Sequence, residues 1–155
     1  MAPLIFESPS ALKDFVGREI AVTDWLTMTQ ERINLFAEAT EDRQWIHLDR
    51  ERAERDSPFK ATIAHGFLTL SLIPHLMQQA MKIRDGLRMA VNYGLNRVRF
   101  MSPVRSGARI RARIALLAWK GIAPDAVEVI YTVTIESEGS EKPCCVAESI
   151  VRYYS

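Results

Sequence analysis

Residues 65–83 read HGFLTLSLIPHLMQQAMKI, and this stretch decides the fold. Placed on a helix, its apolar residues surround the whole cylinder instead of forming one stripe. A helix of that kind has to be covered on several sides. Pro74 has no backbone N–H, so we expect the helix to bend or to begin a new turn there. The apolar run from Ile63 to Met77 is shorter than the roughly 20 residues of a membrane span, which indicates a buried core helix.

The C-terminal half of the chain alternates apolar and polar residues with the period of a β-strand. The expected strands cover residues 110–114, 127–135 and 147–153, with two shorter ones over 89–93 and 97–101. Gly94 separates the two shorter strands, and Gly121 and Gly139 are typical turn residues between the later ones. This pattern predicts an α+β fold in which an antiparallel sheet curls around the helix of residues 65–83.

Two shorter helices are expected before this region. Thr29 can accept a hydrogen bond from an exposed N–H at the start of the first, over residues 30–39. Asp49 opens the second, which ends at Ser57-Pro58 because the residue before a proline is pushed out of the helical region. Residues 40–48 then form a loop between the helices, where functional side chains often lie.

The composition is that of one globular domain over residues 1–155, with 48% hydrophobic and 25% charged residues. A formal charge of +1 gives no field that would recruit nucleic acid or a membrane surface. The N-terminus does not resemble a signal peptide, which predicts a cytoplasmic protein. The adjacent Cys144 and Cys145 suit neither a disulfide framework nor metal-ligand spacing, so we expect two inert strand residues in a reducing compartment.

The loop of residues 39–47 brings a carboxylate, Asp42, and an imidazole, His47, within five residues. If the loop folds back, the two groups can share one water molecule and transfer protons to and from it. The alternative for such a pair is a turn cap and a surface side chain. A zinc site would need Asp42 and His47 together with His65 and His75. We expect no metal, because no two of these residues have the close spacing that places both on one ion.

Residues 36–53 read FAEATEDRQWIHLDRERA and residues 61–72 read ATIAHGFLTLSL. Together they resemble the MaoC-like family of (R)-specific enoyl-CoA hydratases and dehydratases, in particular its nodulation-protein-N-like branch. The family motif is an aspartate, a histidine five residues later and a small residue six further on, matched by Asp42, His47 and Ala53. The resemblance includes His65-Gly66 and NYGLNRVRF at 92–100, and it covers about residues 36–114.

Two departures from the family pattern lie beside the motif. Glu41 stands where many members have glycine, and Gln44-Trp45 replaces an Asn-Pro pair. Glu41 either places a second carboxylate near the site, where it would alter pKa values, or points to solvent.

The resemblance implies a hot-dog fold, in which the sheet wraps around the central helix. It also implies a homodimer with the active site near the interface, and a tunnel beside the helix for the acyl chain of a coenzyme A or acyl carrier protein thioester. The reaction it implies is reversible hydration of a 2-enoyl thioester, without a cofactor. A thioesterase and a non-catalytic acyl-thioester binding module are the rival functions.

The resemblance also implies roles for individual residues. Asp42 and His47 would be the catalytic pair, and the N–H of Gly66 would stabilise negative charge on the thioester oxygen. Ser71, Asn92 and Tyr93 are candidate substrate-binding residues. The alternatives are a tight turn for Gly66 and a hydroxyl bonded one helical turn back for Ser71. Asn92 and Tyr93 could instead border the dimer interface, and Tyr93 could simply pack within its strand.

Two further expectations concern exposure and charge. Gly66 and Ser71 should be largely buried if they serve the site. Arginine side chains suit the phosphates of coenzyme A, although a solvated strand face is the alternative for each. The candidates are Arg97, Arg99 and Arg105.

Overall fold

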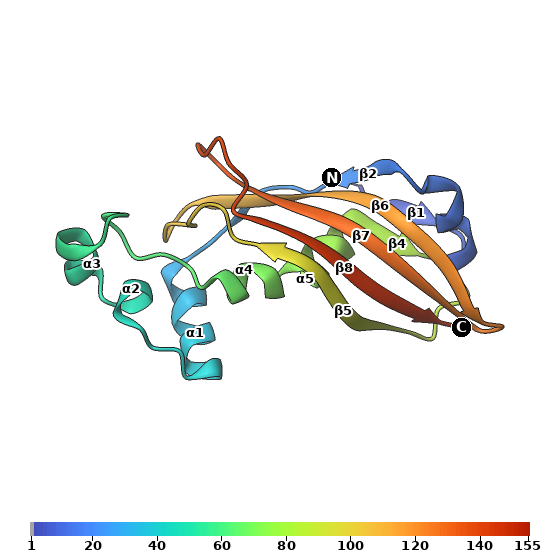
Figure 1. The fold of residues 1–155 in the computed structure, drawn as a ribbon, viewed down its shortest axis with the longest axis horizontal. Coiled ribbons are helices and arrows are strands. Elements are labelled where there is room, and N and C mark those ends of the chain that lie inside the picture. The colour runs from blue at the N-terminus through green and yellow to red at the C-terminus, as the bar shows by residue number, and fades with distance from the viewer. Residues whose placement is uncertain (1) are drawn as a thin grey trace.

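The computed structural model describes residues 2–155 and consists of one curved antiparallel sheet, a short two-stranded pair and a set of helices (Figure 1). The helices are η1 (Pro9–Phe15, 3-10), α1 (Gln30–Thr40), α2 (Trp45–Leu48), α3 (Arg50–Asp56), α4 (Gly66–Ser71) and α5 (Ile73–Ala80). The strands are β1 (Leu4–Phe6), β2 (Arg18–Val22), β3 (Leu26–Thr27), β4 (Met81–Ile83), β5 (Met89–Arg99), β6 (Arg109–Ala123), β7 (Ala126–Ser137) and β8 (Cys145–Tyr154).

The main sheet has the order β2-β6-β7-β8-β5, with β3 also pairing with β6. Its centre confirms the alternation in the sequence, because every second residue of β7 from Val129 to Ser137 is buried. Four of them, Val129, Tyr131, Val133 and Ile135, are completely buried. The fold class is therefore α+β, as predicted.

The expected central helix is two helices, and it ends earlier than predicted. α4 and α5 meet at Leu72, and Pro74 is near the start of α5, where a missing N–H costs no hydrogen bond. Residues 81–83 leave the helix to form β4, which pairs in parallel with β1. The helices also keep an uncovered side, since Phe67 is 68% exposed and His75 is exposed, so one chain alone does not surround them.

Residues 89–99 form one long strand, β5, where two short ones were expected over 89–93 and 97–101. Gly94 lies inside β5, and the pairing with β8 shifts register between Asn92 and Gly94 and again between Asn96 and Arg99. These irregularities let one continuous strand follow the curve of the sheet. β5 has β8 on one side and no strand on the other, so it forms an edge of the described sheet.

The helices before this region largely follow the sequence pattern. Thr29 accepts a hydrogen bond from the N–H of Arg32 at the start of α1, and Asp49 accepts one from Arg52 at the start of α3. The loop expected over 40–48 contains one short helix, α2, and the strands and 3-10 helix of residues 4–27 were not predicted. The three helices α1, α2 and α3 lie together at one end of the molecule (Figure 1).

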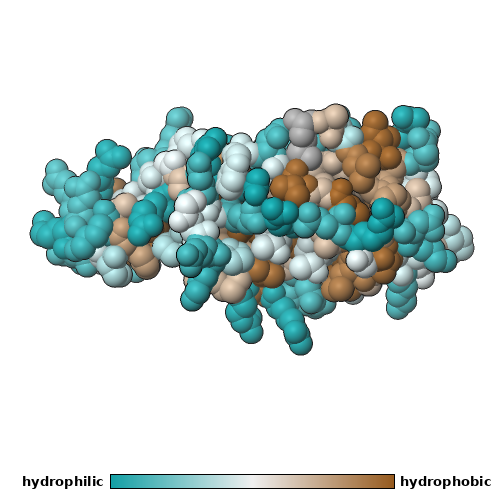
Figure 2. Space-filling view, turned by 90° about the horizontal axis from the view of Figure 1, so that it is seen from above, coloured by the Kyte–Doolittle hydropathy of each residue, from teal (hydrophilic) through white to brown (hydrophobic). Residues whose placement is uncertain are grey.

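The two ends of the molecule differ in surface character. Hydrophilic side chains cover the end that carries α2 and α3, whereas hydrophobic side chains gather toward the opposite end (Figure 2). Cys144 and Cys145 are free and buried, and burial raises their thiol pKa values to about 12 and about 11. Among residues 2–155, no helix has the length and apolar character needed to cross a membrane.

Candidate active site

Glu41 turns the chain out of α1 and positions the aspartate that follows it. Its backbone is left-handed, with φ of 62°, a conformation that glycine adopts at less cost. A glycine would therefore suit this position better than a glutamate. Asp42 is exposed, and the N–H of Gln44 donates to its carboxylate over 3.4 Å.

The ring of His47 is held in one orientation by a backbone carbonyl and by a stacked histidine ring. It is buried on α2, and its Nδ1 lies 2.7 Å from the carbonyl oxygen of Ile63. A carbonyl can only accept, so Nδ1 carries the proton and Nε2 of the neutral ring is a free acceptor. Burial lowers the pKa of His47 below its usual value, as does the neighbouring His65, while the Ile63 hydrogen bond and Asp42 oppose the shift. A neutral His47 is therefore favoured.

His65 is the site residue to which sequence reasoning gave no role. Its ring stacks on that of His47 with centroids 3.8 Å apart and planes 23° apart. Its Nε2 lies 3.0 Å from the backbone carbonyl of Asp42, which ties the aspartate loop to the start of α4. Its Nδ1 is buried and has no hydrogen-bond partner among the described residues. The sequence feature that could have indicated this role is the His65-Gly66 pair.

Asp42, His47 and His65 each offer an oxygen or nitrogen within 4.8 Å of the others. Residues 23 positions apart meet because the chain returns to α1 after α3. Spacing along the sequence therefore did not predict that these three side chains lie together. The stacked rings point their lone pairs along nearly parallel planes, a poor arrangement for two ligands converging on one zinc ion at about 2 Å. His75 lies apart on α5, next to Gln79. The same three groups are also close enough to share a water molecule.

Gly66 is the first residue of α4 and directly follows His65. A Cβ at this position would lie 3.1 Å from the Phe100 ring, so a side chain here would require the ring to shift by a few tenths of an ångström. Gly66 is half-buried, which is less than expected. Its N–H belongs to the first turn of a helix, where no partner lies within the helix.

Ser71 corrects the prediction of a buried site residue. It is exposed, and its hydroxyl donates over 2.6 Å to the carbonyl of Phe67, one turn back on the helix. Asn92 and Tyr93 are also exposed, on the edge strand β5. Arg152 packs over the Tyr93 ring at 3.5 Å. In this single chain, none of the three contacts the Asp42 and His47 cluster.

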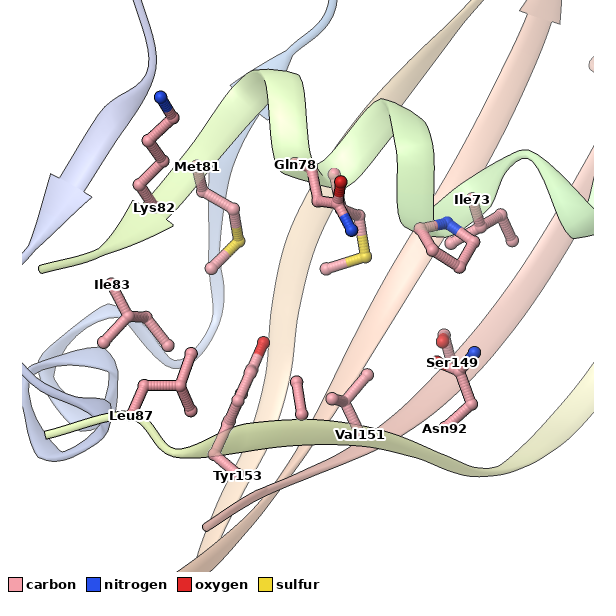
Figure 3. Close-up of a pocket in the computed structure, with 13 residues that line it drawn as sticks. Ile73, Gln78, Met81, Lys82, Ile83, Leu87, Asn92, Ser149, Val151 and Tyr153 are labelled. Carbon is pink, nitrogen blue, oxygen red and sulfur yellow. The ribbon is translucent and has the colours of Figure 1, made fainter. Parts of the chain in front are cut away.

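Two adjoining hollows nevertheless connect these residues to the helix. The first, of about 370 Å³, is lined by Ser71, Asn92 and Tyr93 among others. The second, of about 700 Å³, continues between α5 and the strands β5 and β8 (Figure 3). They share four lining residues, Ile73, Pro74, Asn92 and Ser149. One groove therefore runs along the helix, starting a little over one turn beyond Gly66.

The three candidate arginines are exposed. Arg99 donates to the carbonyl of Val98 and Arg105 to the carbonyl of Phe59, whereas Arg97 has a left-handed backbone in β5. They do not form a cluster with the site histidines. A solvated surface position describes each of them in this structure.

A helix packed on a curled antiparallel sheet defines the hot-dog class, here with a carboxylate and a histidine beside the helix start. Within that class the chain belongs to the MaoC-like family, because the model of the MaoC like domain matches residues 12–138. Membership of this family makes the protein a dehydratase or hydratase type of lyase.

Similar proteins support this assignment. The chain is 50% identical to 3-hydroxyacyl-thioester dehydratase Z of Mycobacterium tuberculosis, over 96% of this chain and 97% of that protein. It is 46% identical to nodulation protein N of Rhizobium leguminosarum bv. viciae, over 87% and 84% of the two chains. In fold it resembles the R-hydratase PhaJ1 of Pseudomonas aeruginosa, with a TM-score of 0.70 at 23% identity over 94% and 84% of the two chains. Chains of this fold also occur in complexes, such as HadBC of Mycobacterium tuberculosis.

Proposed function

We propose that this protein is an (R)-specific enoyl-CoA hydratase, which in reverse is a (3R)-hydroxyacyl-thioester dehydratase. The substrate is a trans-2-enoyl chain carried as a thioester on coenzyme A or acyl carrier protein. The observation that carries the proposal is the juxtaposition of Asp42, His47 and His65, whose polar atoms lie within 4.8 Å of one another. A single water can contact two groups at that separation.

The proposed reaction begins with that water between Asp42 and His47. Nε2 of the neutral His47 ring is free to accept a proton, because Nδ1 is bound to the Ile63 carbonyl. As the water oxygen attacks C3, its proton passes to the pair, and C2 receives a proton from the pair in turn. Dehydration follows the same steps in reverse.

Negative charge develops on the thioester oxygen during attack, and this charge needs a hydrogen-bond donor. The N–H of Gly66 is the proposed donor, supported by its place at the start of α4 directly after His65. The absence of a side chain matters, since the Phe100 ring would meet one at 3.1 Å. Ser71, Asn92 and Tyr93 are proposed to border the acyl chain where it enters the groove.

We also propose that the protein acts as a homodimer. The support is the edge strand β5, whose outward side has no strand partner in the described chain. Several apolar side chains are exposed on and beside it, namely Phe67, Val91, Tyr93 and Leu95. Exposed apolar residues on a free strand edge are the usual mark of an assembly surface. The free, buried cysteines are compatible with the cytoplasmic location that we propose.

The test is an assay of purified protein with crotonyl-CoA that follows the enoyl absorbance and thiol release together. Loss of absorbance without free thiol is the expected result. Thiol release would instead identify a thioesterase. Binding of crotonyl-CoA without either change would identify a non-catalytic module. Metal analysis of the same sample checks whether the cluster of Asp42, His47 and His65 holds a water or a zinc ion. We expect far less than one zinc ion per chain.

A further inference from the structure

The larger hollow is lined by polar as well as apolar side chains, and one of the polar ones is a buried tyrosine. Much of its wall is apolar, formed by residues such as Met77, Met81, Leu87 and Val151. Tyr153 of β8 also lines it, although this side chain is 6% exposed. Its hydroxyl points across the hollow toward α5 (Figure 3).

This hydroxyl forms a buried pair with a second tyrosine. The Oη atoms of Tyr131 and Tyr153 lie 2.7 Å apart, and Tyr131 is completely buried in β7. Burial raises the pKa of both phenols, so both keep their protons. The pair therefore holds two hydrogens, of which their mutual hydrogen bond uses one.

The location of the two phenols decides which hydrogen remains. If Tyr153 donated to Tyr131, the hydrogen of Tyr131 would be left inside the sheet core without a partner, which is costly. If Tyr131 donates to Tyr153, the remaining hydrogen belongs to the hydroxyl that faces the hollow. The second arrangement is favoured, and it leaves one buried donor directed into the groove.

We infer that the groove selects acyl chains with a neutral oxygen acceptor, such as a keto, hydroxyl or ether group, in the part of the chain far from the thioester. The inference rests on the proposed function for the position of the thioester at Gly66. Met77 lies eleven residues after Gly66, about 16 Å along a helix axis. Crotonyl chains do not reach that depth, so short substrates do not report on this group.

The experiment compares kcat/KM for trans-2-hexadecenoyl-CoA, whose chain is long enough to reach Tyr153, with that for the same thioester carrying a keto or hydroxyl group in its distal half. The wild-type protein should favour an oxygenated chain by about three- to tenfold, the effect of one net hydrogen bond. Calorimetric binding of the matched saturated thioesters gives the same comparison without turnover.

Three variants separate the donor from the packing. Tyr153→Phe should bring the ratio of oxygenated to plain substrate close to one. Tyr131→Phe is the matched control, because it removes the other phenol of the same pair and should keep the preference. Tyr131→Phe/Tyr153→Phe leaves no unpaired phenol in the core and should again lose the preference, so a folding defect of the single Tyr153 variant would not hide the result.

The outcomes distinguish the two proposals. Hydration of both thioesters with equal kcat/KM and equal binding in the wild type would overturn the inference and leave the hydratase proposal intact. A preference that survives in the Tyr153 variants would also overturn it. Absence of hydration with a clear binding preference would overturn the proposed reaction while supporting the ligand class. If no thioester binds, both proposals fail.

Discussion

Strands β7 and β5 belong to one sheet but differ in how many neighbouring strands they have and in how far their apolar residues are buried. β7 has β6 and β8 as neighbours, and its inward residues, such as Tyr131 and Val133, are fully buried. β5 has one neighbour, two shifts in register and apolar residues such as Leu95 in solvent. One chain alone therefore buries the core around β7, whereas the edge strand β5 remains exposed. The groove and the candidate acyl-binding residues lie along this edge, where we propose that a second copy of the chain binds.

The largest effect is expected from variants that remove a catalytic group and leave strands β5 and β7 unchanged. Asp42→Asn and His47→Gln should each lower turnover of crotonyl-CoA by roughly a hundredfold or more, because each removes one of the groups that holds the water. Circular dichroism and sedimentation should match the wild type. The double variant should lose far less than the product of the two effects. Full multiplicativity would argue against a shared water.

Gly66 gives the next effect, and it tests the start of α4. Gly66→Pro removes the N–H, and His65 already has the extended backbone that precedes a proline, with φ of −60° and ψ of 135°. Turnover should fall by about a hundredfold, the usual loss for one such donor, while a saturated acyl-CoA still binds.

Gly66→Ala is the steric counterpart of that variant. It keeps the N–H but places a methyl group against Phe100. Its activity should be reduced, and Phe100→Leu in the same protein should restore part of it. A folded Gly66→Pro protein with ordinary turnover would assign the oxyanion role elsewhere and leave Gly66 as a turn residue.

A smaller effect, on self-association, is expected when a charge is placed on the exposed edge strand β5. Leu95→Glu should weaken self-association about thirtyfold or more, the effect of about 2 kcal/mol near the centre of an interface. Leu117→Glu is the matched control, since Leu117 on β6 is 45% exposed and Leu95 is 46% exposed. Analytical ultracentrifugation over a concentration series measures both. Equal association of the two variants would remove β5 from the interface.

The smallest effect concerns the left-handed residue before the catalytic aspartate. Glu41→Gly should raise the free energy of unfolding by about 0.5 kcal/mol, because relief of the positive φ exceeds the entropy that glycine adds to the unfolded chain. Glu54→Gly, at an ordinary exposed position of α3, should lower it by about 1 kcal/mol. Urea denaturation compares the two. A loss of stability in both variants would show that the turn does not need glycine.

Sequence reasoning succeeded where the signal is local. The period of β7, and the capping residues Thr29 and Asp49, depend on neighbours along the chain, and the structure confirms them. It was wrong where pairing decides the outcome. Gly94 was interpreted as a break, yet β8 carries the strand past it by a shift in register. Residues 81–83 continue the apolar run of the helix, but pairing with β1 makes them a strand.

The candidate site shows the same division. Asp42 and His47 came from a local motif, whereas the role of His65 depends on a contact between residues 23 positions apart. The burial expected for Ser71 failed because its side of the helix has no cover within one chain. A second copy of the chain is the proposed cover, and a single sequence does not contain that information locally.

The most direct test of the account is the stereochemistry of hydration. Purified protein is incubated with crotonyl-CoA, and the 3-hydroxybutyryl-CoA formed is assayed with dehydrogenases specific for the (3R) and (3S) products. The account predicts (3R)-3-hydroxybutyryl-CoA from the wild type and almost none from Asp42→Asn. A folded wild-type protein that forms no hydroxyacyl product, or that forms the (3S) product, would contradict it.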